Sequence, residues 1–260
     1  MSGAHSRAPG RFDRQVVYER FGPAGQERLS RGRAIIVGVG GLGCTLADLL
    51  ARSGVGLLRL VDDDVVALEN LHRQVLFDEA DAAAAVPKVA RRIARINGQV
   101  RVETVQERLA PGNAAKLVAD VDLILDGTDN FPTRFLINDL AVKQNIPWVF
   151  AGVVGAEAQT MTILPGRTPC LRCVFDSPPP PCLDPTCRSA GVLAPAVVAV
   201  AAAQAMEAIR ILAGHAESIS PYLTKFDLWT GSLQRMNVAE ACADVDCPCC
   251  KRREFEFLYP

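Results

Sequence analysis

Two residue patterns in this chain could carry chemistry, and they come from different parts of the sequence. The first is a pair of Cys-x-x-Cys motifs, Cys170 with Cys173 and Cys247 with Cys250. Two such thiolate pairs have the spacing of a tetrahedral zinc site. The second is the glycine-rich loop 38–43, GVGGLG, whose spacing suits close approach of backbone N–H groups to a nucleotide phosphate at the start of a helix. Together they predict a nucleotide-binding fold to which zinc fastens a distant C-terminal segment.

The cysteines allow other uses. The chain has nine cysteines, an odd number, and its N-terminus has no secretory signal, so metal binding and thiol chemistry are favoured over a disulfide framework. Either pair could instead be a thioredoxin-like redox site, but neither reads as the start of a helix that follows a strand. Cys249 lies inside the second pair and could replace a neighbour as a ligand, although the two-residue spacing favours Cys247 and Cys250.

Polar residues that suit phosphate chemistry follow the glycine loop. Asp62 and Asp64 stand about 20 residues beyond it, where a dinucleotide-binding unit keeps a carboxylate for the ribose hydroxyls. The loop and Asp62 alone would favour an NAD-dependent oxidoreductase. Arg73 and Lys88, however, add two cations, and Asp129 adds a carboxylate. This set suits phosphoryl or nucleotidyl transfer, because Arg and Lys can hold a polyphosphate while Asp holds Mg²⁺.

Strands that alternate with helices would position these residues. Apolar runs predict strands at 33–39, 56–61, 100–105, 121–125 and 146–154, and the spacing of apolar residues predicts helices at 42–53, 87–96 and 131–144. The alternation predicts an α/β, Rossmann-like fold, a mostly parallel sheet covered by helices on both faces. The polar clusters follow strands, at the carboxyl ends where ligands of such sheets bind.

The C-terminal part follows a different pattern. Segments 159–164, 222–227 and 234–238 read as strands without intervening helices and predict an antiparallel extension. Four prolines at 178–181 predict an exposed crossover, and a helix is expected at 195–213. We expect one integrated domain with three regions: an N-terminal helical arm at 1–30, a nucleotide-binding region at 31–165, and a zinc-fastened region with the crossover loop at 166–260.

Composition excludes several classes of protein. The formal net charge is −1 with both signs interspersed, so no basic field indicates binding to nucleic acid or to an anionic membrane. The longest apolar stretch, 192–203, is too short to span a bilayer and predicts a buried helix. Because the N-terminal residues lack an apolar signal segment, we expect a cytoplasmic protein.

As an ordered set, these motifs make the chain similar to the ubiquitin-activating-enzyme superfamily, and within it to the bacterial MoeB/ThiF/HesA adenylyltransferases. The similarity runs from about Arg11 to Cys250. The matching segments are 11–15 (RFDRQ), the glycine loop, 62–64, 70–74 (NLHRQ), 87–88, 126–130 (DGTDN), both cysteine pairs, 186–187 and 190–195.

The resemblance implies an activity and partners. It implies a homodimer that binds ATP, Mg²⁺ and Zn²⁺ and activates the C-terminal Gly-Gly carboxylate of a ubiquitin-like sulfur carrier protein. The product would be an acyl-adenylate, with release of pyrophosphate. The chain ends at Pro260 without the rhodanese domain of some relatives, so a separate sulfurtransferase or persulfide donor would supply the sulfur.

The resemblance also implies roles for individual residues. The nucleotide site would consist of Gly38, Gly40, Gly41, Gly43, Asp62, Asp64, Asn70, Arg73, Gln74, Lys88, Asp129 and Asn130. Among these, Gly41 and Asp62 would contact the nucleotide. The phosphates would be held by Asn70, Arg73 and Lys88, and Asp129 would direct the metal. Arg14 resembles the residue that reaches into the neighbouring subunit's site. Cys187 matches the position where some members link covalently to the carrier, whereas others bear the cysteine without needing it.

Some alternatives stay open at this point. Cys182 has no counterpart that we recognise, and it could resolve a disulfide or persulfide at Cys187 or have no role. The rival function is an NAD-dependent oxidoreductase, suggested by the glycine loop and Asp62. A catalytically inactive binding module is disfavoured, because every polar position of the nucleotide site is filled.

Overall fold

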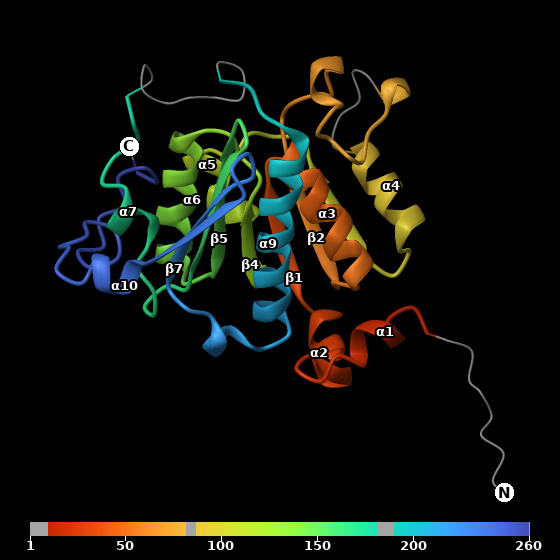
Figure 1. Cartoon of the computed structure of the whole chain (residues 1–260), viewed down its shortest axis with the longest axis horizontal. Helices are drawn as coiled ribbons and strands as arrows, with labels where there is room; N and C mark the ends of the chain where they lie inside the picture. Colours follow the sequence, from red (N-terminus) through yellow and green to blue (C-terminus); the bar gives the residue numbers. More distant parts are fainter. Residues whose placement is uncertain (1–9, 82–86, 181–189, 260) are drawn as a thin grey trace, which may run out of the picture.

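A mixed eight-stranded sheet organises the protein. The structure is a computed structural model that describes residues 10–81, 87–180 and 190–259, without the side chains of residues 87 and 88. The strand order is β3-β2-β1-β4-β5-β6-β7-β8 (Figure 1). The strands are β1 (Arg33–Val37), β2 (Leu57–Val61), β3 (Arg101–Val105), β4 (Leu123–Asp126), β5 (Trp148–Val154), β6 (Glu157–Ile163), β7 (Tyr222–Asp227) and β8 (Ser232–Asn237).

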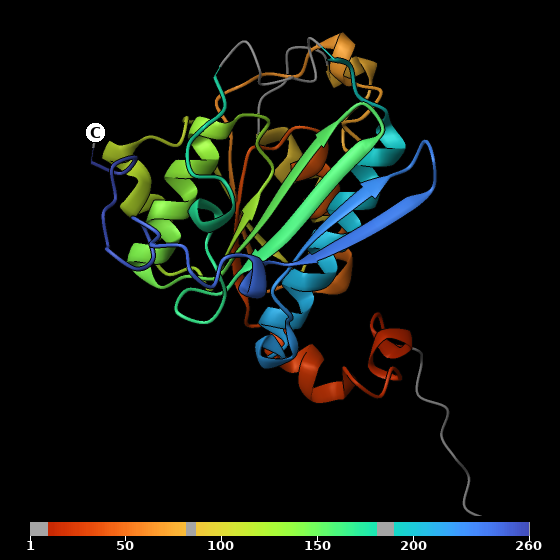
Figure 2. The same ribbon diagram turned by 60° about the vertical axis from the view of Figure 1, so that its left-hand side comes forward.

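The sheet has a parallel half and an antiparallel half. Strands β1 to β5 pair in parallel, whereas β5–β6, β6–β7 and β7–β8 pair antiparallel and form the long ribbons of Figure 2. This confirms the predicted α/β class and its antiparallel C-terminal extension. Neighbours β1 and β4 lead into connections that run in opposite directions along the sheet. Such a switch in strand order opens a crevice at the carboxyl ends of the strands.

Helices cover both faces of the sheet. They are α3 (Gly41–Ser53), α4 (Pro87–Ile96), α5 (Pro111–Leu117), α6 (Phe131–Gln144), α7 (Leu171–Val174), α9 (Ala194–Leu212) and α10 (Val238–Ala241). Two apolar cores result, one containing α3, α4 and α9 and the other containing α5, α6 and α7. Because side chains alternate along a strand, Ile36 of β1 enters the first core and Ile35 enters the second.

Helix α9 lies against the sheet. Its length and composition would be sufficient to cross a membrane. It nevertheless packs on α3, β5 and β6, with Val200 and Gln204 completely buried. The Gln204 amide donates to the carbonyls of Asp126 (2.9 Å) and Val149 (3.1 Å). These contacts bury one side of α9 in the core, whereas Val198 and Met206 are exposed. The sequence predicted a buried helix here, and the structure buries it on this side alone.

Two short N-terminal helices, α1 (Asp13–Val16) and α2 (Gly22–Leu29), lie beyond one end of the sheet (Figure 1). The Gln15 amide donates to the carbonyl of Ser53, the last residue of α3, at 2.9 Å. Arg11 donates to the carbonyl of Ile96, the last residue of α4, at 3.0 Å. The helical arm is therefore attached to the carboxyl ends of α3 and α4, away from the glycine loop that begins α3.

Candidate nucleotide site and four-cysteine centre

The glycine loop connects β1 to α3 and meets the loop after β4. Gly38 has φ +83°, and a Cβ atom there would lie 2.8 Å from the Gly127 carbonyl carbon. A Cβ atom on Gly43 would lie 2.0 Å from the Gly38 carbonyl oxygen. A cleft lies at this point, between the glycine loop and the loop after β4. Gly38, Gly40 and Gly41 line it, whereas Gly43 does not. The structure thus gives Gly43 a packing contact that brings the helix against the loop.

Asp62 supports the loop from the end of β2. One carboxylate oxygen accepts the Val39 N–H at 2.6 Å, and the other accepts the Asp64 N–H at 2.9 Å. Burial raises the pKa of Asp62, and these two hydrogen bonds oppose the rise. Asp62 and Asp64 both line the cleft, so the carboxylate expected to bind ribose also holds the phosphate loop in place.

Arg73 lies over the start of α3. Its Nη2 donates to the Asn70 side-chain oxygen at 2.9 Å, and the Gly41 position leaves room for its side chain, since a Cβ there would lie 3.1 Å from the Arg73 Cγ. Gln74 is buried, lines the same cleft, and has an Oε1 atom without a hydrogen-bond partner among the described residues. Buried polar atoms are normally paired, so this orphan oxygen indicates a site shaped for a ligand or bound water.

Asp129 and Asn130 approach the cleft from the other side. Asn130 caps α6 by accepting the Thr133 N–H at 3.0 Å. Asp129 precedes the cap and is exposed in the cleft. The cleft is lined by residues 37–38, 40–42, 61–64, 70, 73–74, 107–109, 127–130, 133–134, 153 and 197.

The structure brings together most of the residues named from the sequence. The exceptions are Gly43, which packs behind the loop, and Lys88, whose side chain is not described. Arg14 is exposed on α1, at the opposite end of α3 from the cleft. Cys182 and Cys187 lie outside the described residues. Sequence reasoning missed Glu107, Arg108, Thr133 and Arg134, because single polar residues after a strand or in a helix carry no spacing signal.

A second cleft adjoins the first. It is lined by residues 129, 131, 134, 152–154, 157–159, 225–227, 232 and 234, most of them on the antiparallel strands. Asp129, Arg134 and Val153 line both clefts. The first cleft therefore adjoins a groove along β5 to β8, and these three residues stand at the junction.

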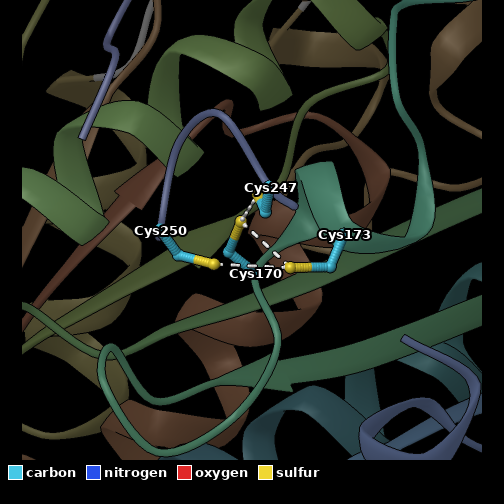
Figure 3. Close-up of side chains that lie close together, drawn as sticks. All are labelled: Cys170, Cys173, Cys247 and Cys250. Carbon is cyan, nitrogen blue, oxygen red and sulfur yellow. Dashed lines mark hydrogen bonds between the residues drawn. The ribbon is translucent and has the colours of Figure 1, made fainter. Parts of the chain in front are cut away.

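The four predicted cysteines form a cluster between α7 and the segment 247–250 (Figure 3). All four sulfurs lie within 4.8 Å of one another. The Cys170 Sγ atom lies 3.8 Å from the Sγ of Cys173 and 3.5 Å from that of Cys247. The Sγ atoms of Cys173 and Cys250 are 3.4 Å apart. Four thiolates at zinc–sulfur distances of about 2.3 Å would be separated by about 3.8 Å in a tetrahedron, so the cluster fits zinc.

The chemistry of these thiols also fits a cation. Hydrogen bonds from neighbouring thiols lower the pKa of Cys247, whereas hydrogen bonds within the cluster raise the pKa values of Cys173 and Cys250. Metal ligation requires the deprotonated thiolates, and a bound cation would offset the repulsion among four negative charges this close together.

The sequence argument against a redox pair was wrong in one respect. Cys170 does lie at the N-cap of a helix, the four-residue α7. The clustering of two distant pairs nevertheless favours a metal centre. Cys249 is outside the cluster and accepts a hydrogen bond from the Asn138 amide at 3.3 Å, so the four sulfurs that lie together are those favoured by the two-residue spacing.

The fold and the two sites define a Rossmann-like nucleotide-binding protein with a four-cysteine knuckle. The chain belongs to the ThiF family, whose sequence model matches residues 12–249. It is 39% identical over 252 residues to the sulfur carrier protein ThiS adenylyltransferase of Bacillus subtilis, covering 96% of this chain and 74% of that protein.

Other relatives agree with this assignment, and a solved structure shares the fold. A sulfur carrier protein adenylyltransferase of Thermus thermophilus is 37% identical, over 92% of this chain and 90% of the relative. The SAMP-activating enzyme E1 of Haloferax volcanii is 36% identical, over 92% and 88%. The crystal structure of E. coli MccB with ATP superposes with a TM-score of 0.80 at 24% identity, covering 93% of this chain and 74% of that one, which supports the fold.

Proposed function

We propose that this protein is an ATP-dependent adenylyltransferase that activates the C-terminal Gly-Gly carboxylate of a ubiquitin-like sulfur carrier protein. The observation that carries the proposal is the continuous pair of clefts. One contains a glycine loop, Arg73 and Asp129, and it shares three lining residues with the other, which lies along β5 to β8. Membership of the ThiF family and the names of the relatives support it.

The reaction joins two anions. A carboxylate oxygen of the carrier attacks the α-phosphorus of ATP, the bond from that phosphorus to the bridging oxygen breaks, and pyrophosphate leaves. Fixed cations and backbone N–H groups must lie where charge develops on the phosphates. Arg73, oriented by Asn70, and the N–H groups at the start of α3 supply these donors.

Two metals fit the residues present. Mg²⁺, held by Asp129 in the cleft, would screen the phosphate charge during transfer. Zinc, held by Cys170, Cys173, Cys247 and Cys250, would fasten the C-terminal segment to α7. The chain itself would orient the nucleotide through Arg73 and the glycine loop.

We also propose that the working unit is a homodimer. Arg14 is exposed on an arm that attaches to the carboxyl end of α3, and the 13-residue α3 separates that end from the cleft by about 20 Å. A cation at this distance can serve a cleft only in a second copy of the chain. The same proposal includes a separate persulfide donor, which would supply sulfur to the activated carboxylate. It also includes a covalent link between Cys187 and the carrier.

Pyrophosphate exchange tests the activity. The enzyme is incubated with ATP, labelled pyrophosphate and B. subtilis ThiS, or with a SAMP carrier, and label should enter ATP only when a carrier with a free C-terminus is present. Arg73→Ala should reduce exchange by ~10²–10³, since one oriented donor to a developing oxyanion has that effect. Absence of exchange with both carriers, together with tight NAD binding, would favour an oxidoreductase.

Mixing inactive variants tests the dimer. Arg14→Ala and Asp129→Ala chains, each inactive alone, are co-refolded in equal amounts. About a quarter of the wild-type activity should return, because half the dimers are mixed and each mixed two-fold dimer has one intact site. No recovery in a verified heterodimer would contradict a site shared between subunits.

A further inference from the structure

A buried arginine stands at the junction of the two clefts. Arg134 lies in the first turn of α6, and only 7% of its side chain is exposed. It lines both clefts together with Asp129 and Val153. No other described arginine or lysine lines both.

The position is an unfavourable one for a cation. The N-terminal end of a helix carries partial positive charge, and burial removes solvation from the guanidinium. The chain compensates with several contacts. Nε lies 3.2 Å from the Asp126 carboxylate, Nη2 donates to the Thr128 carbonyl at 2.8 Å, and the rings of Phe131 and Phe150 lie 5.3 and 5.5 Å from the guanidinium carbon.

These contacts leave donors unused. A guanidinium has five N–H groups, and the protein hydrogen bonds of Arg134 involve only Nε and Nη2. Within the described part of the chain, Nη1 has no acceptor. Gly152 of β5 lies beside the group, and a Cβ atom there would be in van der Waals contact with it, 3.6 Å from Nη2 and 3.7 Å from Nη1. The unused donors therefore lie next to a position without a side chain, where the two clefts meet.

The ion pair also controls the charge of the junction. Asp126 is fully buried and accepts hydrogen bonds from the Thr128 N–H (2.9 Å) and hydroxyl (2.6 Å). Its carboxylate balances the Arg134 charge. The junction therefore offers oriented N–H donors while its net charge stays balanced. An unbalanced cation would attract a bound carboxylate more strongly and reduce its nucleophilicity.

We propose that Arg134 binds the C-terminal carboxylate of the carrier at the junction and orients one oxygen toward the α-phosphorus. This inference rests on the proposed function and adds a substrate-binding residue to it. The Nη1 group donates to the carboxylate oxygen that becomes the carbonyl of the acyl-adenylate, while the other oxygen forms the bond to phosphorus. Asp126 holds the guanidinium in this orientation through Nε.

The test separates substrate binding from folding. Arg134→Lys keeps the charge but loses the planar fork. The paired variant Asp126→Asn with Arg134→Gln removes both charges, so no buried ion is left unpaired. Arg59→Lys is the matched control: Arg59 is a half-buried arginine paired with Glu103 at 2.8 Å and bonded to backbone carbonyls, and it lines neither cleft.

Three measurements are made on each full-length variant: melting temperature, ATP affinity by calorimetry, and kcat/KM for exchange with B. subtilis ThiS. Binding of ThiS is also compared with that of ThiS bearing a C-terminal amide. The unaltered enzyme should prefer the carboxylate by about 10- to 100-fold, as expected for one hydrogen bond to a charged group. Both Arg134 variants should lose this preference and ~10² or more in kcat/KM while ATP affinity changes less than about threefold.

The outcomes are distinguishable. If the paired variant keeps exchange within about tenfold of the unaltered enzyme, or still discriminates carboxylate from amide, Arg134 does not bind the carrier. Loss of ATP affinity in parallel with exchange would instead make the ion pair a support of the nucleotide loop, and this too would overturn the inference. If the unaltered enzyme shows no carrier-dependent exchange, the proposed function fails and the role of Arg134 fails with it.

Discussion

Replacing Gly43 by alanine should damage the nucleotide loop without touching the nucleotide. The added Cβ would lie 2.0 Å from the Gly38 carbonyl oxygen and 2.9 Å from its carbonyl carbon. Both atoms belong to backbone that is also held by Gly127, so the loop cannot move away freely. Helix α3 must shift by about 1 Å or more, and overpacking of this kind typically costs ~1–3 kcal/mol.

Gly112→Ala is the matched control. Gly112 lies in α5, is exposed, and would place its Cβ more than 4 Å from neighbouring atoms. Alanine there should be neutral or stabilise by up to ~1 kcal/mol, because glycine has greater freedom in the unfolded chain. The two variants add the same atom to the protein, and only the surroundings differ.

Thermal unfolding and ATP titration measure the outcome. For a chain of this size, 1 kcal/mol corresponds to a shift of roughly 2–4 °C in Tm. Gly43→Ala should therefore lower the Tm of the nucleotide-free protein by several degrees and weaken ATP binding, whereas Gly112→Ala should do neither. An unchanged Tm with weakened ATP binding would assign Gly43 to nucleotide contact and refute the packing argument.

Three further predictions concern the cysteines and pH. Cys173→Ser and Cys250→Ser should each lose zinc, measured by plasma emission, and have a lower Tm and lower activities. Cys242→Ser should keep the metal, because the Cys242 sulfur lies outside the cluster and donates to the Cys173 carbonyl. Zinc retained by Cys250→Ser would contradict a four-thiolate site. Cys187→Ser should keep zinc and pyrophosphate exchange, and if Cys187 forms a covalent link it should lose thiocarboxylate formation on the carrier, scored by mass spectrometry; unchanged thiocarboxylate yield would exclude the covalent role. Burial raises the pKa of Asp62 above its ordinary 3.8. Between the pKa of the unfolded chain and the higher pKa of the folded protein, the folded protein therefore binds more protons at this carboxyl. The free energy of unfolding of the wild type relative to Asp62→Asn, measured in urea without nucleotide, should therefore rise as pH falls from 7 toward 4, and a difference independent of pH would show that the pKa is not raised.

Much of the fold could be predicted because its signals are local. Strand and helix periods and the glycine loop are relations between residues a few positions apart, and the elements at 33–37, 41–53 and 131–144 formed close to where the pattern placed them. Helix α5 was not predicted, because seven residues, PGNAAKL, are too few to establish a period of 3.6. Its position depends instead on packing of Ala114 and Leu117 in the second core.

The sequence by itself determined the types and spacing of the chemical groups. It contained the four thiols with the spacing of a metal site, the phosphate loop, and the order of polar residues after each strand. Only the tertiary structure decided how they are used. It placed Gly43 in a packing contact, put Arg14 at the far end of α3, buried Gln74, and set Arg134 against Asp126 between two clefts. These properties depend on contacts between segments that are distant in sequence. Burial, pairing and orientation arise only when the strands assemble, so no local pattern encodes them.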